Sequence, residues 1–230
     1  NEENMKQLSA DILSKEKIVS KLAIALAEKR EAGAKSLKAG VEKELKELHM
    51  NGVRFGVQFS YPQDPEGFVE YRKEKLKPTP LGLGTLEFLF SPNPGEDLRP
   101  LAKIASGGEL SRIMLALKSI LNEQDTIPVM IFDEVDAGIG GRVAEKVGDK
   151  LKKVAETKQV FCITHLPQIA GMASSHYRVE KHVQGKRTRS GIRQLEFEER
   201  VEEVARMSSG EKITDASLKH ARELILGAGL

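Results

Sequence analysis

The chain has 230 residues, of which 40% are hydrophobic and 30% are charged, and its formal net charge at pH 7 is +2. This balance excludes an intrinsically disordered chain, and so small a net charge excludes a surface that coats nucleic acid through overall charge. The only cysteine, Cys162, excludes an internal disulfide framework and fits a reducing cytoplasm.

The first residues do not have the pattern of a signal peptide, and no apolar stretch approaches the length of a membrane span. Since the chain lacks an initiator methionine, we expect it to begin inside a longer protein or after processing.

Residues 1–50 are predicted to form one long helix. Apolar residues of its first half share one seam, with steps of four, seven, three and four: Leu8, Ile12, Val19, Leu22 and Leu26. After a slip, the seam resumes at Leu37, Val41, Leu45 and Leu48. Two interpretations remain open: a coiled-coil arm whose antiparallel partner lies outside this chain, or an amphipathic helix packed on its own domain.

The next region favours strands and loops. Residues 53–59 alternate apolar with polar or small side chains, which predicts a half-buried strand, and residues 85–90 resemble a second strand. Seven of the nine prolines lie in residues 62–100, so no long helix is expected there.

From residue 106 the pattern becomes α/β. The continuous apolar run at 127–132 predicts a strand buried on both faces. A right-handed crossover would place it parallel to the strand at 159–164. The expected elements are helices at 109–122, 142–156, 198–207 and 214–226, and antiparallel strands at 177–182 and 189–197 around Gln184-Gly185.

A glycine pair stands where a loop is predicted to become a helix, in Ser106-Gly107-Gly108-Glu109. Ser106 followed three residues later by Glu109 is a capping-box pattern, which predicts the helix start. Glycines leave backbone N–H groups open, and the positive end of a helix dipole attracts phosphate. This segment is therefore either a phosphate-binding helix tip or only a capped helix start.

Two adjacent acids, Asp133 and Glu134, follow the strand predicted at 127–132. Ligands bind at the carboxyl edge of α/β sheets, where these acids would emerge. In phosphoryl transfer the first acid commonly holds Mg²⁺, and the second orients or deprotonates the attacking water. The alternative is a solvated pair at a strand end, although Asp136 adds a third carboxylate within four residues.

His165 ends the strand predicted at 159–164. If the two strands are neighbours, Glu134 and His165 leave the same edge of the sheet, about 5 Å apart. A histidine there can donate a hydrogen bond to a γ-phosphate or to the hydrolytic water, although a lone histidine is more often structural.

In their order along the chain, these segments resemble the signature motif, Walker B motif and switch histidine of ABC and SMC-type ATPases. Over about residues 50–226 the chain is similar to the RecN family of bacterial DNA-repair ATPases in particular. The strings that carry this resemblance are Ala105-Ser106-Gly107-Gly108-Glu109-Leu110-Ser111-Arg112, Phe132-Asp133-Glu134-Val135-Asp136-Ala137-Gly138-Ile139-Gly140-Gly141, Ile163-Thr164-His165-Leu166-Pro167-Gln168, Glu203-Val204-Ala205-Arg206-Met207 and Ile213-Thr214.

The resemblance implies an α/β fold: the C-terminal lobe of an ABC/SMC-type P-loop ATPase head, with a mostly parallel sheet and flanking helices, at 51–230. Residues 1–50 would be a segment of coiled-coil arm returning to the head.

The resemblance also implies roles for individual residues. Asp133 would support Mg²⁺, Glu134 would be the catalytic base, and His165 would sense the γ-phosphate. Four signature residues would bind the γ-phosphate of ATP held on a second head: Ser106, Gly107, Gly108 and Glu109. The implied cofactors are therefore ATP and Mg²⁺, and a homodimer of heads would complete the site.

At the level of biology, the resemblance implies ATP-dependent repair of DNA double-strand breaks in the bacterial cytoplasm, in association with the nucleoid. The implied partners are the N-terminal half of the same head and DNA ends or single-stranded regions, with no membrane. Two alternatives remain: an ATP-gated structural clamp on DNA in which turnover is secondary, and the ATPase subunit of a transporter.

Two departures from the wider pattern matter. Gly140 replaces the Asp expected in the loop after Walker B of general SMC and ABC proteins, which agrees with the RecN family. The sequence has no P-loop, since Gly33-Ala34-Lys35-Ser36 lacks the adjacent Gly-Lys and lies in the predicted helix. The chain alone is therefore expected not to hydrolyse ATP.

Other polar residues carry weaker expectations. A basic cluster in the predicted hairpin is read first as a solvated surface and second as a DNA-phosphate contact: Arg178, Lys181, Lys186, Arg187, Arg189 and Arg193. Cys162 is expected to be a small core residue. The remaining histidines receive no role: His49, His176, His182 and His220.

Overall fold

The computed structural model describes residues 2–103, 106–184, 187–210 and 212–227. It divides into two compact units: residues 1–46 with 50–104, and residues 47–49 with 105–230. Residues 1–46 thus share a unit with residues 50–104. None of the helices in the described ranges is long and apolar enough to cross a membrane.

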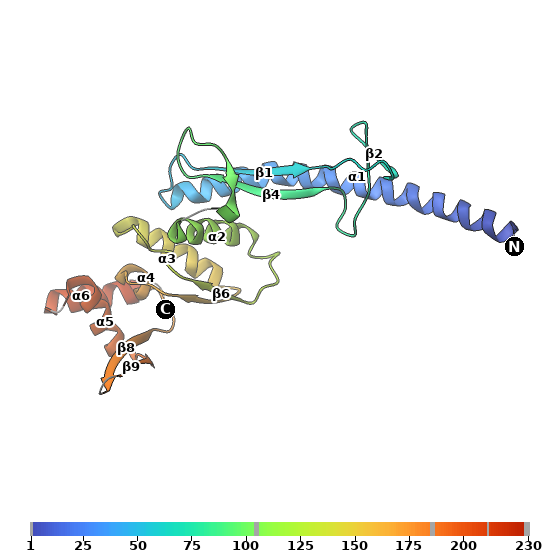
Figure 1. Ribbon diagram of the computed structural model, residues 1–230. Coiled ribbons are helices and arrows are strands. Elements are labelled where there is room, and N and C mark those ends of the chain that lie inside the picture. The colour runs from blue at the N-terminus through green and yellow to red at the C-terminus, as the bar shows by residue number, and fades with distance from the viewer. Residues whose placement is uncertain (1, 104–105, 185–186, 211, 228–230) are drawn as a thin grey trace. The chain divides into compact units, whose positions relative to one another are not determined.

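The first unit combines one long helix with short antiparallel sheets (Figure 1). Strand β4 pairs on one side with β1 and on the other with β5, and β2 pairs with β3. Its elements are α1 (Glu2–Glu47), β1 (Arg54–Ser60), β2 (Val69–Tyr71), β3 (Glu74–Leu76), β4 (Thr85–Ser91), β5 (Arg99–Pro100) and the 3₁₀ turn η1 (Leu101–Lys103). The expected helix and two main strands are confirmed.

Helix α1 changes character along its length. Its C-terminal seam residues Val41 and Leu45 are fully buried, and Ala23 and Ala27 pack against the β2–β3 hairpin. The seam before them is exposed: Leu8, Ile12, Val19, Leu22 and Leu26. Each of the two open interpretations therefore fits one part of the helix, which is packed on its own unit toward the C-terminal end and lacks apolar cover toward the N-terminal end.

The second unit has α/β order. Strands β6 and β7 are parallel and joined through α3, so the predicted parallel pairing is confirmed. The other strand pair, β8 with β9, is antiparallel as expected, with Gly185 of the predicted turn outside the described residues. The elements are α2 (Gly107–Leu121), β6 (Val129–Phe132), α3 (Gly141–Ala155), β7 (Gln159–Cys162), α4 (Pro167–Gly171), β8 (Tyr177–Gln184), β9 (Arg187–Gln194), α5 (Phe197–Ser209) and α6 (Asp215–Gly227).

The expectation that residues 127–132 are buried on both faces is wrong for this chain. Met130 and Phe132 are buried on one face of β6, whereas Val129 and Ile131 on the other face are 42% and 70% exposed. Phe161 of the neighbouring strand is exposed as well. Two strands rarely form a stable sheet alone, so this apolar face is typical of a sheet that continues in, or packs against, another segment.

The last three helices form a separate apolar cluster within this unit. Side chains from α4, α5 and α6 make it up: Ala170, Val201, Val204, Ala205, Ala221 and Ile225. The short helix α4 was not predicted, because it has only five residues and an apolar face that small gives no periodic signal. It begins with Pro167, a residue favoured in the first turn of a helix.

Candidate functional site

The parallel strands β6 and β7 end side by side. The carbonyl oxygen of Phe132 accepts a hydrogen bond of 2.9 Å from the N–H of Ile163, one residue beyond the last ladder pair. The loop that begins at Asp133 and the segment Thr164-His165 therefore leave the sheet at one carboxyl edge. The Asp-Glu pair and the histidine share this edge, as the sequence predicted.

Helix α2 begins where the glycine pair predicted. Ser106 is its N-cap, with an extended backbone and a side-chain oxygen 3.4 Å from the N–H of Glu109. Only this half of the capping box is formed at α2, whereas α5 has the reciprocal pair in full, between Glu196 and Glu199. Ser106 and Gly107 are exposed, so backbone groups at this helix tip face solvent.

Two side chains of α2 hold the loop that follows β6. The Ser111 hydroxyl donates a hydrogen bond of 2.6 Å to the carbonyl oxygen of Asp133. The guanidinium of Arg112, which is only 9% exposed, donates to the carbonyl oxygens of Val135 and Ala137, at 3.4 and 2.8 Å. Burial lowers the pKa of Arg112. The loop that carries the acids is therefore fixed to the helix that carries the glycines.

Close packing requires the second glycine of the pair, whereas the atom that faces the first is the movable end of a side chain. A Cβ atom on Gly107 would lie 2.1 Å from Oε2 of Glu134, and one on Gly108 would lie 2.8 Å from the Cβ of Ala137. Glu134 itself has a φ of 57°, a left-handed conformation that is uncommon outside glycine. The unusual backbone places the Glu134 carboxylate against the tip of α2 within the same chain.

The side chains of Glu134 and His165 diverge although they leave the same edge. Glu134 lies against Gly107, while Nδ1 of His165 lies 3.0 Å from Oδ2 of Asp136. Oδ2 of Asp136 also accepts hydrogen bonds from the Thr164 hydroxyl, at 2.5 Å, and from the backbone N–H of His165, at 2.9 Å. Asp136, only 3% exposed, is thus the side chain that joins the two strand ends.

The donor set at this edge suits a cation that is held partly by phosphate. No group of three His, Cys, Asp or Glu side chains converges as a metal cage within the ranges that the structure describes. Asp133 is exposed, and its Oδ1 accepts a hydrogen bond of 2.9 Å from the N–H of Glu134. Mg²⁺ commonly takes one or two carboxylates and completes its octahedron with water and substrate phosphates, so Asp133 fits that ion.

Cys162 lies on β7 beneath this edge, and its thiol is expected to be unreactive. Burial, with smaller contributions from Asp136 and Asp133, raises the pKa of the thiol to about 12. An ordinary thiol ionises near pH ~8.5, so at pH 8 the reactive thiolate should be roughly a thousandfold scarcer in the folded chain than in the unfolded one.

We expect a disulfide reagent at pH 8 to modify the folded chain at least about 100-fold more slowly than the urea-unfolded chain, with a rate that rises with pH. Because Cys162 is the only thiol, the reaction reports on this position alone. Equal rates in the two states would show that the thiol is neither buried nor shifted.

The basic hairpin is neutralised in part where its side chains are described, at Arg178 and Arg193. Arg178 pairs with Glu180 and Glu203, and Arg193 pairs with Glu199 at 2.5 Å. Lys186 lies outside the described residues, as does the side chain of Arg187. The pairing favours the first interpretation of this cluster, a structural surface, over a contact with DNA phosphates.

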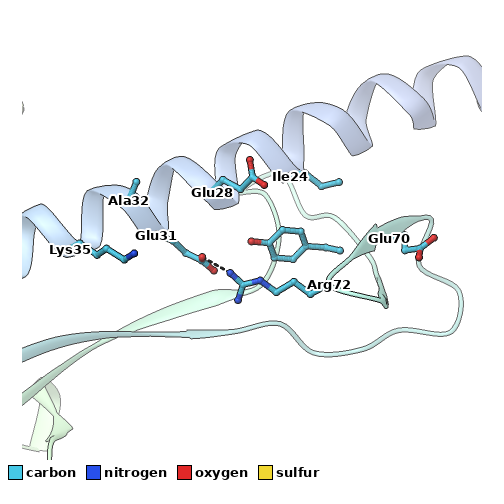
Figure 2. A pocket seen from close by; sticks show the side chains of 8 residues that line it. Ile24, Glu28, Glu31, Ala32, Lys35, Glu70 and Arg72 are labelled. Atoms are coloured by element: carbon cyan, nitrogen blue, oxygen red, sulfur yellow. Dashed lines mark hydrogen bonds and ion pairs between the residues drawn. The ribbon is translucent and has the colours of Figure 1, made fainter.

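A pocket of about 500 Å³ in the first unit lies between α1 and the β2–β3 hairpin (Figure 2). Figure 2 shows Arg72 of the hairpin reaching Glu31 of α1, at 2.5 Å, and Glu31 also accepts a hydrogen bond from the Tyr61 hydroxyl. Burial and this hydrogen bond raise the pKa of Tyr61. Since Arg72 and Glu31 pair across it, we interpret the pocket as the joint between hairpin and helix.

Sequence reasoning missed two polar residues of the edge site. Arg112 and Thr164 belong to the strings that carry the family resemblance, but the sequence predicts no role for either. No periodic pattern marks Arg112 as buried, because its acceptors are carbonyl oxygens of a loop. Nothing in the order of residues indicates that Thr164 would donate to Asp136, because that contact depends on strand pairing.

Comparison with known proteins adds an independent finding. The chain is 45% identical over 201 residues to the DNA repair protein RecN of Treponema pallidum, covering 87% of this chain and 34% of that protein. It is 43% identical over 204 residues to RecN of Streptomyces coelicolor, covering 89% and 36%. For RecN of Bacillus subtilis the identity is 38% over 224 residues, covering 96% and 39%. No protein-family model matches the chain.

The resemblance to RecN is thus confirmed over most of this chain, which spans only 34–39% of the length of these relatives. Among solved structures, the Smc head domain with a coiled coil and joint from Pyrococcus yayanosii gives a TM-score of 0.57 at 18% identity, covering 92% of this chain and 36% of that one. This likeness shows the fold, an α/β lobe of an SMC-type head preceded by a long helix.

Proposed function

We propose that this chain is part of an ATPase that acts in bacterial DNA double-strand-break repair, and that it supplies the signature, Walker B and switch-histidine lobe of the head. The observation that carries the proposal is the meeting of Asp133-Glu134, His165 and the glycine tip of α2 around one sheet edge. The similarity to proteins described as DNA repair protein RecN supports the choice of process.

In this proposal each group has one task. Asp133 holds Mg²⁺, which neutralises charge that develops on the phosphates of ATP. Glu134 accepts a proton from the attacking water, and its carboxylate lies beside Gly107 at the tip of α2. The signature segment, Ser106 to Glu109, offers backbone N–H groups and the positive end of α2 to the γ-phosphate of ATP on a second head.

The phosphates of the cis nucleotide require a P-loop, which this sequence does not contain. We place that motif in an N-terminal half of the head, outside this chain. We propose that this half packs on the exposed apolar face of β6 and β7, which carries Val129, Ile131 and Phe161. Burial of this face would complete the sheet and remove apolar area from water.

The proposal is tested by turnover. The 230-residue chain alone is expected to show no ATP hydrolysis above background. Expression of the full natural reading frame, or co-expression of this chain with the upstream segment, is expected to give Mg²⁺-dependent hydrolysis. The rate per protein molecule should rise with protein concentration, because two heads form each site. A reading frame without an upstream P-loop, or a full-length protein that does not hydrolyse ATP, would reject the proposal.

A further inference from the structure

The backbone of Glu134 has a left-handed conformation at the position of the proposed catalytic base. Its φ is 57°, which a residue with a side chain rarely adopts and keeps only where surrounding contacts hold it. Glu134 is itself exposed, so burial of its own side chain does not supply this constraint. The constraint has to come from contacts made by the residues on either side of it.

Two adjacent residues of α2 supply such contacts. The hydroxyl of Ser111 donates to the carbonyl oxygen of Asp133, the preceding residue, at 2.6 Å. The guanidinium of Arg112 donates to the carbonyl oxygens of Val135 and Ala137, which follow, at 3.4 and 2.8 Å. The chain is thus attached to one helix both before and after the left-handed residue. A change of that residue's φ would break at least one of these hydrogen bonds.

Close packing leaves the loop little room to shift toward the helix. Arg112 is only 9% exposed, and a Cβ atom on Gly108 would lie 3.5 Å from its Nη1. The same Cβ would lie 3.1 Å from the carbonyl oxygen of Glu134, which accepts a hydrogen bond of 3.0 Å from the N–H of Ala137. The donors of a guanidinium form a rigid planar fork, so Arg112 fixes two carbonyl groups relative to each other.

We propose that Ser111 and Arg112 are positioning residues that hold Glu134 in its left-handed conformation. They thereby keep its carboxylate beside Gly107 at the tip of α2. The catalytic consequence rests on the proposed function, in which Glu134 accepts a proton from the attacking water. Without these hydrogen bonds, the backbone of Glu134 relaxes toward negative φ, and its carboxylate leaves the helix tip. Ser111 and Arg112 act through the backbone and need no contact with the nucleotide.

The backbone conformation is measurable without nucleotide, by NMR of the isotopically labelled 230-residue chain. A left-handed residue gives an intense cross-peak between its own amide and Hα protons, because positive φ brings the two together. We expect this signal for Glu134 in the wild-type chain and a marked loss of it in Arg112→Met, which keeps an apolar stem but removes the donors. Absence of the signal from the wild-type chain, or its persistence in a folded Arg112→Met chain, would overturn the proposal.

Arg200→Met is the matched control for Arg112→Met. Arg200 is 7% exposed, belongs to the same unit, and donates to the carbonyl oxygens of Ala173 and Ser174. The substitution removes an equally buried guanidinium from two carbonyl groups, so it should lower the melting temperature and leave the Glu134 signal intact. If Arg200→Met also removed the signal, the loss would reflect a general loosening of the fold, and the positioning role would be rejected.

Ser111→Ala tests the other side of the loop, and it decides the question if circular dichroism shows that Arg112→Met does not fold. Its control is Ser119→Ala, because the Ser119 hydroxyl donates within α2, to the carbonyl oxygen of Leu115 at 2.8 Å. We expect the Glu134 signal to weaken in Ser111→Ala and to stay unchanged in Ser119→Ala. A wild-type signal in folded Ser111→Ala would contradict the proposed hold on both sides of the base.

In an active full-length protein, we expect Arg112→Met to lower kcat by roughly 10- to 100-fold and to leave the KM for ATP within about threefold, because the base is misplaced while nucleotide contacts remain. Arg200→Met should keep kcat within about twofold of the wild-type value. The two proposals fail separately. An inactive full-length protein whose Glu134 signal depends on Arg112 would reject only the function. An active protein whose Glu134 signal and kcat survive Arg112→Met would reject only the positioning role.

Discussion

Replacement of Glu134 by glutamine in the full-length protein is expected to lower the rate of ATP hydrolysis by about 10²- to 10⁴-fold, the usual effect of removing a general base. Glutamine has nearly the same size and shape as glutamate, so the side chain can still pack against Gly107. ATP binding should persist, because the phosphates are held by other groups. We therefore expect ATP to accumulate on the protein and to favour the two-headed form, measurable by nucleotide retention and by light scattering.

Glu123→Gln is the matched control, since Glu123 is an exposed carboxylate beyond the last residue of α2 in the same unit. It should leave hydrolysis unchanged. Normal turnover in Glu134→Gln would remove Glu134 from the proposed role. If the variant lost turnover and yet supported repair in cells, the ATP-gated clamp would become the better description of the protein.

The sequence predicted most of the α/β unit because its signals are local. Continuous apolar runs, a helix cap and a crossover of ordinary length determine β6, β7, α2 and α3 with little help from distant residues. The meeting of Asp133-Glu134 with His165 followed from strand order alone, since parallel neighbours end at one edge.

The direction of the side chains at that edge was not predictable in the same way. The positive φ of Glu134 and the contact of its carboxylate with Gly107 depend on how α2 packs against the loop after β6. The pairing of Asp136 with His165 depends on the register of two strands separated by a helix. Such contacts follow from tertiary packing, for which residue order gives no periodic signal.

The exposed face of β6 contradicts the expectation that this strand is buried on both faces, and it also offers a test of where the other half of the head binds. A continuous apolar run indicates a strand covered on both faces, yet Ile131 is 70% exposed in this chain. If the missing half of the head covers this face, the sequence pattern is correct for the complete head and incomplete only for the part present here. The pattern then reports on a partner that the chain does not contain.

Ile131→Asp is therefore expected to have a small effect in the isolated chain and a large effect in the complete head. In the 230-residue chain the substitution should change the free energy of unfolding by less than about 1 kcal/mol, because the side chain is exposed. In the complete head it would bury an unpaired carboxylate, which costs several kcal/mol. Association of this chain with the upstream half, measured by calorimetry or co-purification, should weaken by at least about 100-fold.

Leu81→Asp is the matched control, because Leu81 is 76% exposed and belongs to the other compact unit. It introduces the same charge at an equally exposed apolar position, so it should leave association within about threefold of the original chain if the effect is specific to the sheet face. If the Ile131→Asp chain bound the upstream half with normal affinity, that half would have to contact a surface other than the exposed face of β6. A comparable loss with Leu81→Asp would indicate a general effect of charge, because apolar burial on β6 cannot account for a change at a position outside that sheet.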